Sequence, residues 1–320
     1  MKTSTIVWTI VVLILVGIGA YFLIQSPSNN APVVTENQGT TTGTTQPQNN
    51  TQTGQTQAVD QHKGGSQFVI GKSVEGRDIT AHYYGNGGKK ILFVGGIHGG
   101  YEWNTALVAY ELMDYLKANP TTVPSNEQVT VIPVLNPDGL NKVVGTTNRF
   151  TSADVASSVD VQVSGRFNAN NVDLGRNFDC NWKSDGVWQS KTVSGGSQVF
   201  SEPESKAVRD YVASYKPDAV VVWYSAAGGV FASSCLTASD AQAGNSGILP
   251  ETNTITNIYA NASGYPAYKS FDFYKITGDI VDWLAKNNIP AISVLLSTHT
   301  DTEWNKNLAG IKALLEHYAQ

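Results

Sequence analysis

The sequence is poor in cysteine and in charged residues, and both shortages exclude whole classes of protein. Its 320 residues include two cysteines, Cys180 and Cys235, too few for a disulfide-built scaffold or a zinc finger. Only 15% of the residues are charged, the formal net charge is −5, and no run of basic residues occurs. Nucleic-acid-binding domains concentrate basic residues, so we expect no nucleic-acid partner.

Charge is absent from a long stretch near the N-terminus. No charged residue lies between Lys2 and Glu36, and residues 6–24 are nearly all apolar, which is long enough for a helix to span a bilayer. We predict that residues 1–25 form a transmembrane signal-anchor, with Lys2 inside and the rest of the chain outside the cytoplasm. The alternative is a secreted protein whose signal peptide is cleaved near Gly17-Ile18-Gly19.

Aromatic residues are absent from residues 26–66, which are rich in Thr, Gln, Asn and Gly. Such a segment cannot bury a core, so we predict a disordered linker. From residue 67 onward, short apolar runs typical of buried strands alternate with helical patterns such as the one that begins at Trp103. This alternation predicts a single α/β domain over residues 67–320, with a mixed, mostly parallel central sheet flanked by helices.

An imidazole and a carboxylate lie at one strand-to-helix junction. His98 follows the predicted strand 91–94, and Glu102 comes four residues later, directly before a helical pattern. Ligands of α/β sheets gather at the carboxyl ends of the strands, and zinc accepts nitrogen and carboxylate donors together. The two residues are therefore candidate metal ligands. The alternative for an isolated pair of this kind is that both side chains bind only the backbone of the loop.

Two arginines, Arg166 and Arg176, lie ten residues apart in a segment rich in Gly and Asn. The arginine fork of donors matches the geometry of a carboxylate, which makes both candidates for anion binding. The alternative is a pair of surface arginines in a loop.

Together these motifs resemble the zinc carboxypeptidases of the carboxypeptidase A type. The resemblance extends over about residues 68–318, with the motifs in the family's order. It implies the family fold, zinc as the cofactor and peptide C-termini as partners. The matching motifs are Glu75-Gly76-Arg77, Gly95-Gly96-Ile97-His98 with Glu102, Asn136-Pro137-Asp138-Gly139, Val172–Phe178, Phe200–Glu204 and Tyr274-Lys275-Ile276-Thr277-Gly278.

The resemblance also implies a role for each matching residue. His98 and Glu102 correspond to the first two zinc ligands, with one residue more between them than is usual in the family. Arg166 corresponds to the arginine that polarises the scissile carbonyl and stabilises its oxyanion. Three further residues are implied to bind substrate, namely Arg176 at the terminal carboxylate, Arg77 at a subsite and Tyr274 as a mobile cap.

Three positions depart from the family pattern. Tyr224 stands where the third zinc ligand is usually histidine, Leu295 where the general base is usually glutamate, and Gly175 where an asparagine is usual. A phenol ligates only as phenolate, and its free pKa is about 10, while leucine accepts no proton. We therefore expect zinc to bind weakly or not at all, and hydrolysis to be lost or strongly impaired. We also expect a more positive pocket, because the glutamate is missing.

Substitutes for the missing groups are scarce. His299 and His82 are alternative third ligands, and Glu303 is a distant alternative base, although its place at the start of the last helix suits a carboxylate for a different reason. In the family fold, the segments of Cys180 and Cys235 both border the active site. The resemblance therefore implies a disulfide outside the cytoplasm, the alternative being two free thiols.

Three functions follow as expectations. The first is a membrane-tethered domain that recognises the C-terminal carboxylate of peptides with little or no hydrolysis. The second is an active metallocarboxypeptidase with an unusual ligand and base. The third is a purely structural surface domain.

Overall fold

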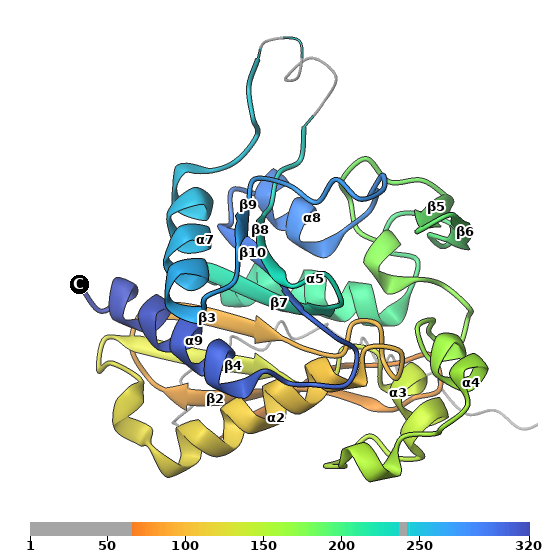
Figure 1. Cartoon of the computed structure of the whole chain (residues 1–320), viewed down its shortest axis with the longest axis horizontal. Helices are drawn as coiled ribbons and strands as arrows, with labels where there is room; N and C mark the ends of the chain where they lie inside the picture. Colours follow the sequence, from red (N-terminus) through yellow and green to blue (C-terminus); the bar gives the residue numbers. More distant parts are fainter. Residues whose placement is uncertain (1–65, 237–241, 243) are drawn as a thin grey trace, which may run out of the picture. The chain divides into compact units, whose positions relative to one another are not determined.

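A mixed sheet forms the centre of the domain (Figure 1). The computed structural model describes residues 66–236, 242 and 244–320. In these residues, eight strands pair in the order β1-β2-β4-β3-β7-β10-β8-β9. Their bounds are β1 Gln67–Lys72, β2 Asp78–Gly85, β3 Lys89–Val94, β4 Glu127–Ile132, β7 Ala219–Ser225, β8 Gly229–Ala232, β9 Ala267–Tyr268 and β10 Ala291–Leu296.

The strand directions confirm the predicted mixture. Strands β3/β4, β3/β7, β7/β10 and β8/β9 pair parallel, whereas β1/β2, β2/β4 and β8/β10 pair antiparallel. Parallel pairings thus form the centre of the sheet, as the alternating strand and helix patterns predicted. A separate hairpin of β5 (Asp185–Trp188) and β6 (Lys191–Ser194) was not predicted.

Helices cover both faces of this sheet (Figure 1). Along β3, Ile91 and Phe93 belong to a core with α2, α7 and α9, whereas Leu92 and Val94 belong to a second core with α5 and α8. This alternation follows from the two-residue period of a strand buried on both sides. The helices are α2 Trp103–Ala118, α3 Pro137–Val144, α4 Val159–Ser164, α5 Pro203–Tyr215, α7 Pro250–Ser263, α8 Ile280–Lys286 and α9 Trp304–Tyr318.

Two local motifs mark the starts of helices. Residues 136–139 have the Pro-Asp-Gly composition that predicts a turn, but they form the start of helix α3, whose N-cap Asn136 accepts a hydrogen bond from the Gly139 amide at 2.9 Å. The pattern Ser201-Glu202-Pro203-Glu204 predicts a capping box, which is absent. Helix α5 does begin at Pro203, but no side chain caps it, and Glu204 instead accepts a bond from the Val74 amide.

The predicted membrane anchor, residues 1–25, and all but the last residue of the predicted linker lie outside the described residues. In the part of the chain that the structure describes, no helix is both long and apolar enough to cross a bilayer.

The sheet brings the strand ends of the candidate site together. Strands β3, β7 and β10 are neighbours and run parallel, so the loops that follow them leave the same edge. Tyr224 and Leu295 are direct register partners in the β7/β10 pair. The two positions at which we expect the main departures from the family pattern are therefore adjacent on one face of the sheet.

Candidate functional site

A cavity of about 1000 Å³ lies at this edge of the sheet. It gathers residues that are up to about two hundred positions apart in the sequence. Seven of the predicted site residues line it: His98, Glu102, Arg166, Arg176, Tyr224, Tyr274 and Leu295.

Arg77 lies elsewhere. Its Nη1 is 2.7 Å from Asp138 Oδ1, and it also pairs with Glu75. It lines a second cavity, of about 600 Å³, together with Lys72 and Arg149. The structure thus separates Arg77 from the other candidate residues, and its role at a subsite stays a prediction.

His98 and Glu102 are buried and face each other. The His98 Nδ1 atom lies 2.9 Å from Glu102 Oε1, and its Nε2 atom lies 3.2 Å from Asp173 Oδ1. Glu102 immediately precedes helix α2, where the helix dipole stabilises a negative charge. Burial disfavours the ionised form of Asp173, yet the charges of Arg166, Arg176 and His98 hold its pKa well below the usual range. Asp173 thus orients the imidazole.

Arg166 joins this buried group. Its Nε and Nη2 atoms each lie 2.9 Å from Asp173 Oδ2. Its Nη1 atom lies 3.1 Å from His98 Nδ1 and 3.6 Å from Glu102 Oε1. The Arg166 Nη1 atom therefore lies next to both predicted metal ligands.

Gly175 fits closely against the imidazole. A Cβ atom at this position would come within 2.8 Å of His98 Nε2 and 3.3 Å of Asp173 Oδ1. An asparagine, the residue that the resemblance predicts here, would collide with His98 in its present position. The position of His98 thus gives a structural reason for a glycine at this place.

Arg176 is held by main-chain oxygens and keeps one donor free. Its Nε donates to Val187 O at 3.0 Å and its Nη1 to Gly175 O at 2.5 Å. Its Nη2 has no hydrogen-bond partner among the described residues, although the side chain is only 2% exposed. The Tyr274 ring lies 6.0 Å from the Arg176 Cζ. A ligand oxygen in the cavity is the natural partner for this orphan donor.

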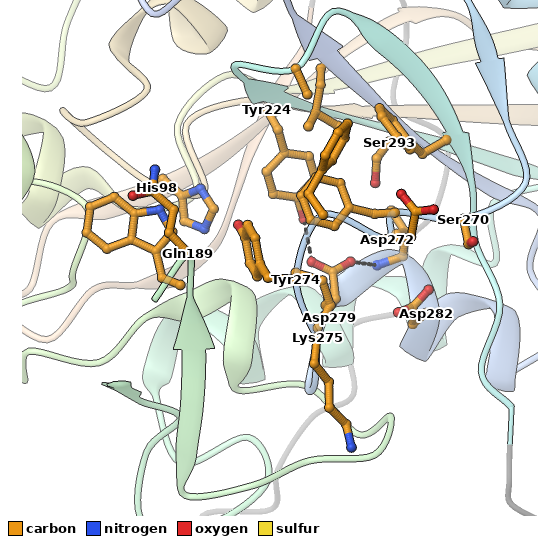
Figure 2. A pocket seen from close by; sticks show the side chains of 18 of the residues that line it. His98, Gln189, Tyr224, Ser270, Asp272, Tyr274, Lys275, Asp279, Asp282 and Ser293 are labelled. Carbon is orange, nitrogen blue, oxygen red and sulfur yellow. Dashed lines mark hydrogen bonds between the residues drawn. The ribbon is translucent and has the colours of Figure 1, made fainter. Parts of the chain in front are cut away.

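The Tyr224 hydroxyl is engaged in a hydrogen bond with a carboxyl group. The hydroxyl donates to Asp279 Oδ2 at 2.9 Å, as Figure 2 shows. Burial and the neighbouring Asp279 raise the pKa of Tyr224 well above 10. The phenol is therefore neutral and serves as a hydrogen-bond donor.

The residues present do not complete a three-ligand zinc centre. His98 and Glu102 supply two donors, but the described residues contain no cluster of three or more His, Cys, Asp or Glu side chains arranged to hold a metal ion. His299 packs against Tyr101, with 4.7 Å between the ring centroids, on the cavity wall. His82 lines the second cavity instead.

Glu303 is also engaged elsewhere. Its carboxylate accepts hydrogen bonds from the Tyr265 hydroxyl and the Ser297 amide, and it pairs with Lys306. These contacts outweigh burial and lower the pKa of Glu303 to about 2. It occupies the N-cap position of helix α9 without a side-chain capping bond, and it does not line the cavity.

Sequence reasoning missed the carboxyl groups of the cavity. Asp279 and Asp282 line it, together with Arg166, Arg176 and Lys275. The expectation of a more positive pocket stays a prediction. Burial, with the Asp279 charge second, raises the pKa of Asp282 to about 8. The sequence does contain a signal for these carboxyl groups, namely two aspartates three residues apart shortly after the Tyr274 motif.

The two cysteines, Cys180 and Cys235, form a disulfide with a Cα–Cα separation of 5.8 Å. The bridge links the segment after Arg176 to the segment after β8. It therefore connects two parts of the chain that contribute to the cavity wall.

Comparison with known proteins agrees with this geometry. The family model for zinc carboxypeptidases, Peptidase_M14, matches residues 57–309. Metallocarboxypeptidase A of Trichophyton tonsurans is 35% identical over 133 residues, which cover 38% of this chain and 30% of that protein. Gamma-D-glutamyl-L-diamino acid endopeptidase 1 of Lysinibacillus sphaericus is 28% identical over 236 residues, covering 67% of this chain and 57% of that protein. The matched regions thus span less than two thirds of the length of each of these relatives.

Solved structures share the fold. Thrombin activatable fibrinolysis inhibitor superposes with a TM-score of 0.61 at 18% identity, covering 79% of this chain and 69% of that chain. Murein-tripeptide amidase MpaA from Escherichia coli O157 gives a TM-score of 0.52 at 18% identity, covering 78% and 90%. With the family model matched over most of the domain, the chain belongs to the zinc carboxypeptidase family.

Proposed function

We propose that this domain binds the C-terminal carboxylate of peptides and hydrolyses the terminal peptide bond poorly or not at all. The observation that carries the proposal is the pairing of Tyr224 with Leu295 at adjacent strand ends. The family has a zinc ligand at one of these positions and a general base at the other. A neutral phenol bound to Asp279 and a leucine supply neither.

Arg176 supports the binding half of the proposal. Its buried guanidinium keeps Nη2 without a partner, while main-chain oxygens hold Nε and Nη1. A buried charged donor without a hydrogen-bond partner raises the free energy of the folded protein, and a peptide carboxylate would supply that partner. Arg166, in contrast, is already paired with Asp173.

The hydrolytic half is tested with the full-length chain in detergent, a mixed peptide library and added zinc. We expect no C-terminal trimming by the natural protein, but trimming by the double variant Tyr224→His/Leu295→Glu. The matched control, Tyr224→Phe/Leu295→Met, changes the same two positions without adding a ligand or a base and is expected to stay silent. Chelator-sensitive cleavage by the natural protein would contradict the proposal.

The binding half is tested by calorimetry with peptides that differ only in a free or amidated C-terminus. We expect binding of the free acid and none of the amide, and no binding of either by Arg176→Met. Equal affinity for acid and amide would refute the proposal and favour a purely structural domain. Peptides from proteins and from cell walls both belong in the panel, since two similar proteins carry names that refer to a diamino acid and to murein.

Hydrolysis with a different ligand and base is the second candidate function. The observation that favours it is that two predicted zinc ligands and a carboxyl group line one cavity. His98 Nδ1 and Glu102 Oε1 are 2.9 Å apart, and the Asp279 carboxyl lines the same cavity. Under this function the purified protein contains one zinc ion per chain, and Asp279→Asn reduces cleavage. Elemental analysis of the purified chain separates the two functions without relying on an activity assay.

A further inference from the structure

Four buried side chains, Arg166, His98, Glu102 and Asp173, form one charged group, which we call the Arg166 cluster. Their exposed fractions are 1%, 4%, 2% and 0%. Besides the imidazole, the cluster consists of two carboxylates and one cation, the guanidinium of Arg166. Carboxylates buried this deeply raise the free energy of the folded protein unless a positive charge pairs with them. The guanidinium supplies that charge from within the chain.

The contacts of Arg166 engage both predicted metal ligands. Its Nη1 atom lies 3.1 Å from His98 Nδ1 and 3.6 Å from Glu102 Oε1. Zinc binds the lone pair of an imidazole nitrogen that has no proton. The Nδ1 atom either accepts a hydrogen bond from Nη1, since arginine only donates, or carries a proton that faces Glu102 Oε1 at 2.9 Å. In both cases its lone pair is not available to a metal ion.

The other two nitrogens of the guanidinium fix its position. Arg166 Nε and Nη2 each lie 2.9 Å from Asp173 Oδ2. The other oxygen of the same carboxylate, Oδ1, lies 3.2 Å from His98 Nε2. Asp173 therefore holds the guanidinium and the imidazole against each other.

Aromatic rings cover the guanidinium. The Arg166 Cζ atom lies 4.6 Å from the centre of the Trp188 ring and 5.7 Å from that of the Tyr101 ring. Trp188 belongs to the β5–β6 hairpin, is 5% exposed, and contacts Tyr101 with 5.0 Å between the ring centroids. Aromatic faces attract a cation, and more strongly where water is excluded. The hairpin thus helps to keep the guanidinium beside the predicted metal ligands.

We propose that the guanidinium of Arg166 takes the place of the zinc cation in this chain and competes with zinc for His98 and Glu102. Two protein ligands are too few to displace it, whereas a third ligand, as in Tyr224→His, shifts the competition toward the metal. The natural chain is therefore folded without zinc. This inference goes beyond the proposed function, because it holds whether or not a peptide carboxylate binds at Arg176.

The first test measures zinc affinity by calorimetry, with the full-length chain in detergent and zinc chloride alone. We expect Arg166→Leu to bind one zinc ion per chain at least about tenfold more tightly than the natural chain, because zinc no longer competes with charge-assisted hydrogen bonds. Leucine removes the charge and adds no metal ligand. Glu102 Oε2 has no hydrogen-bond partner among the described residues, so it also stands open to the metal. Equal affinity of the two proteins, or no binding by either, would overturn the inference.

Two further variants locate the effect. Arg209→Leu removes the same charge from helix α5, where Arg209 pairs with Asp210 and lines neither of the two cavities described above. We expect it to bind zinc as weakly as the natural chain. Adding Glu102→Gln to Arg166→Leu removes one of the freed ligands and is expected to reverse the gain. A gain in Arg209→Leu, or a gain that survives Glu102→Gln, would show that zinc binds elsewhere and overturn the inference.

A second measurement uses only the natural chain and does not depend on the folding of a variant. Thermal unfolding is followed with excess zinc and with excess chelator. We expect the two midpoint temperatures to agree within about 1 °C, because a metal that does not bind the folded chain does not stabilise it. A fall of more than about 5 °C on addition of chelator would show that bound zinc stabilises the natural chain, contrary to the inference. Peptide binding is measured separately, so failure of the proposed function leaves both tests unaffected.

Discussion

Single residues explain why the candidate site has its present form. Gly175 leaves room for the His98 imidazole, which a side chain at that position would meet at 2.8 Å. The Tyr224 hydroxyl donates to Asp279, which also lines the cavity. Two of the three expected departures from the family pattern thus belong to a contact with another residue of the cavity.

Glu127, at the start of β4, gives a prediction at the residue scale. It is fully buried, and neither carboxylate oxygen has a hydrogen-bond partner among the described residues. Burial raises its pKa from 4.5 to about 7. A carboxyl with a raised folded-state pKa is neutral at low pH, and its ionisation destabilises the fold progressively between pH 4.5 and pH 7.

We therefore expect Glu127→Gln to stabilise the protein above pH 7, by roughly 1 to 3 kcal/mol. Near pH 4.5 the variant and the natural protein are expected to unfold at similar urea concentrations. The measurement is urea unfolding of both proteins between pH 4.5 and pH 8. A difference in stability that does not depend on pH would assign the effect of the variant to packing.

Elements place the functional residues. Helix α3 begins beside the site, and its N-cap Asn136 serves two segments at once. Asn136 Oδ1 caps the helix through the Gly139 amide, and Asn136 Nδ2 donates to Arg166 O at 3.3 Å. The Asn-Pro-Asp-Gly motif therefore fixes the backbone that presents Arg166.

Replacing this cap gives a prediction at the element scale. Asn136→Ala is expected to lower the free energy of unfolding by about 2 kcal/mol, from the lost cap and the unsatisfied buried carbonyl. Asn136→Ser can still cap the helix but does not reach Arg166 O, so we expect roughly half that loss. Urea unfolding of both variants measures the difference. Equal losses would show that the cap contributes nothing.

The whole chain combines a zinc carboxypeptidase domain with a long apolar segment near its N-terminus. Residues 6–24 lie outside the described part of the structure, so their role stays a prediction from length and hydrophobicity. We propose that they anchor the domain to a membrane, outside the cytoplasm.

At this scale we expect the full-length chain to sediment with membranes and to stay there in alkaline carbonate. Deletion of residues 1–25 is expected to release it into the soluble fraction. The matched variant Leu13→Lys/Val16→Asp keeps the length but places two charges in the apolar run, and it is also expected to release the chain. A full-length chain cleaved after residue 19 and found in the medium would support the signal-peptide alternative.

Local patterns were enough to predict the α/β class and a mixed central sheet flanked by helices. The sequence predicts strand β3 from a continuous apolar run, because a strand buried on both faces is apolar throughout. It predicts helix α2 from helical spacing, because a helix buried on one face has apolar residues at three- and four-residue steps. Motifs in family order likewise identified His98, Glu102, Arg166, Arg176 and Tyr274, and the structure brings all five to one cavity. These residues were predictable because each belongs to a short contiguous motif.

Contacts between distant segments were decided only by the tertiary structure. Nothing in the sequence pairs Tyr224 with Asp279, 55 residues later, or separates Arg77 from the cavity. Asp279 and Asp282 were missed because they belong to none of the motifs used, and their burial depends on where helix α8 packs. The sequence by itself determined the family and the fold class. Only the tertiary structure decided which charged groups lie together in the cavity, because charge and burial at a site depend on neighbours that the chain order does not reveal.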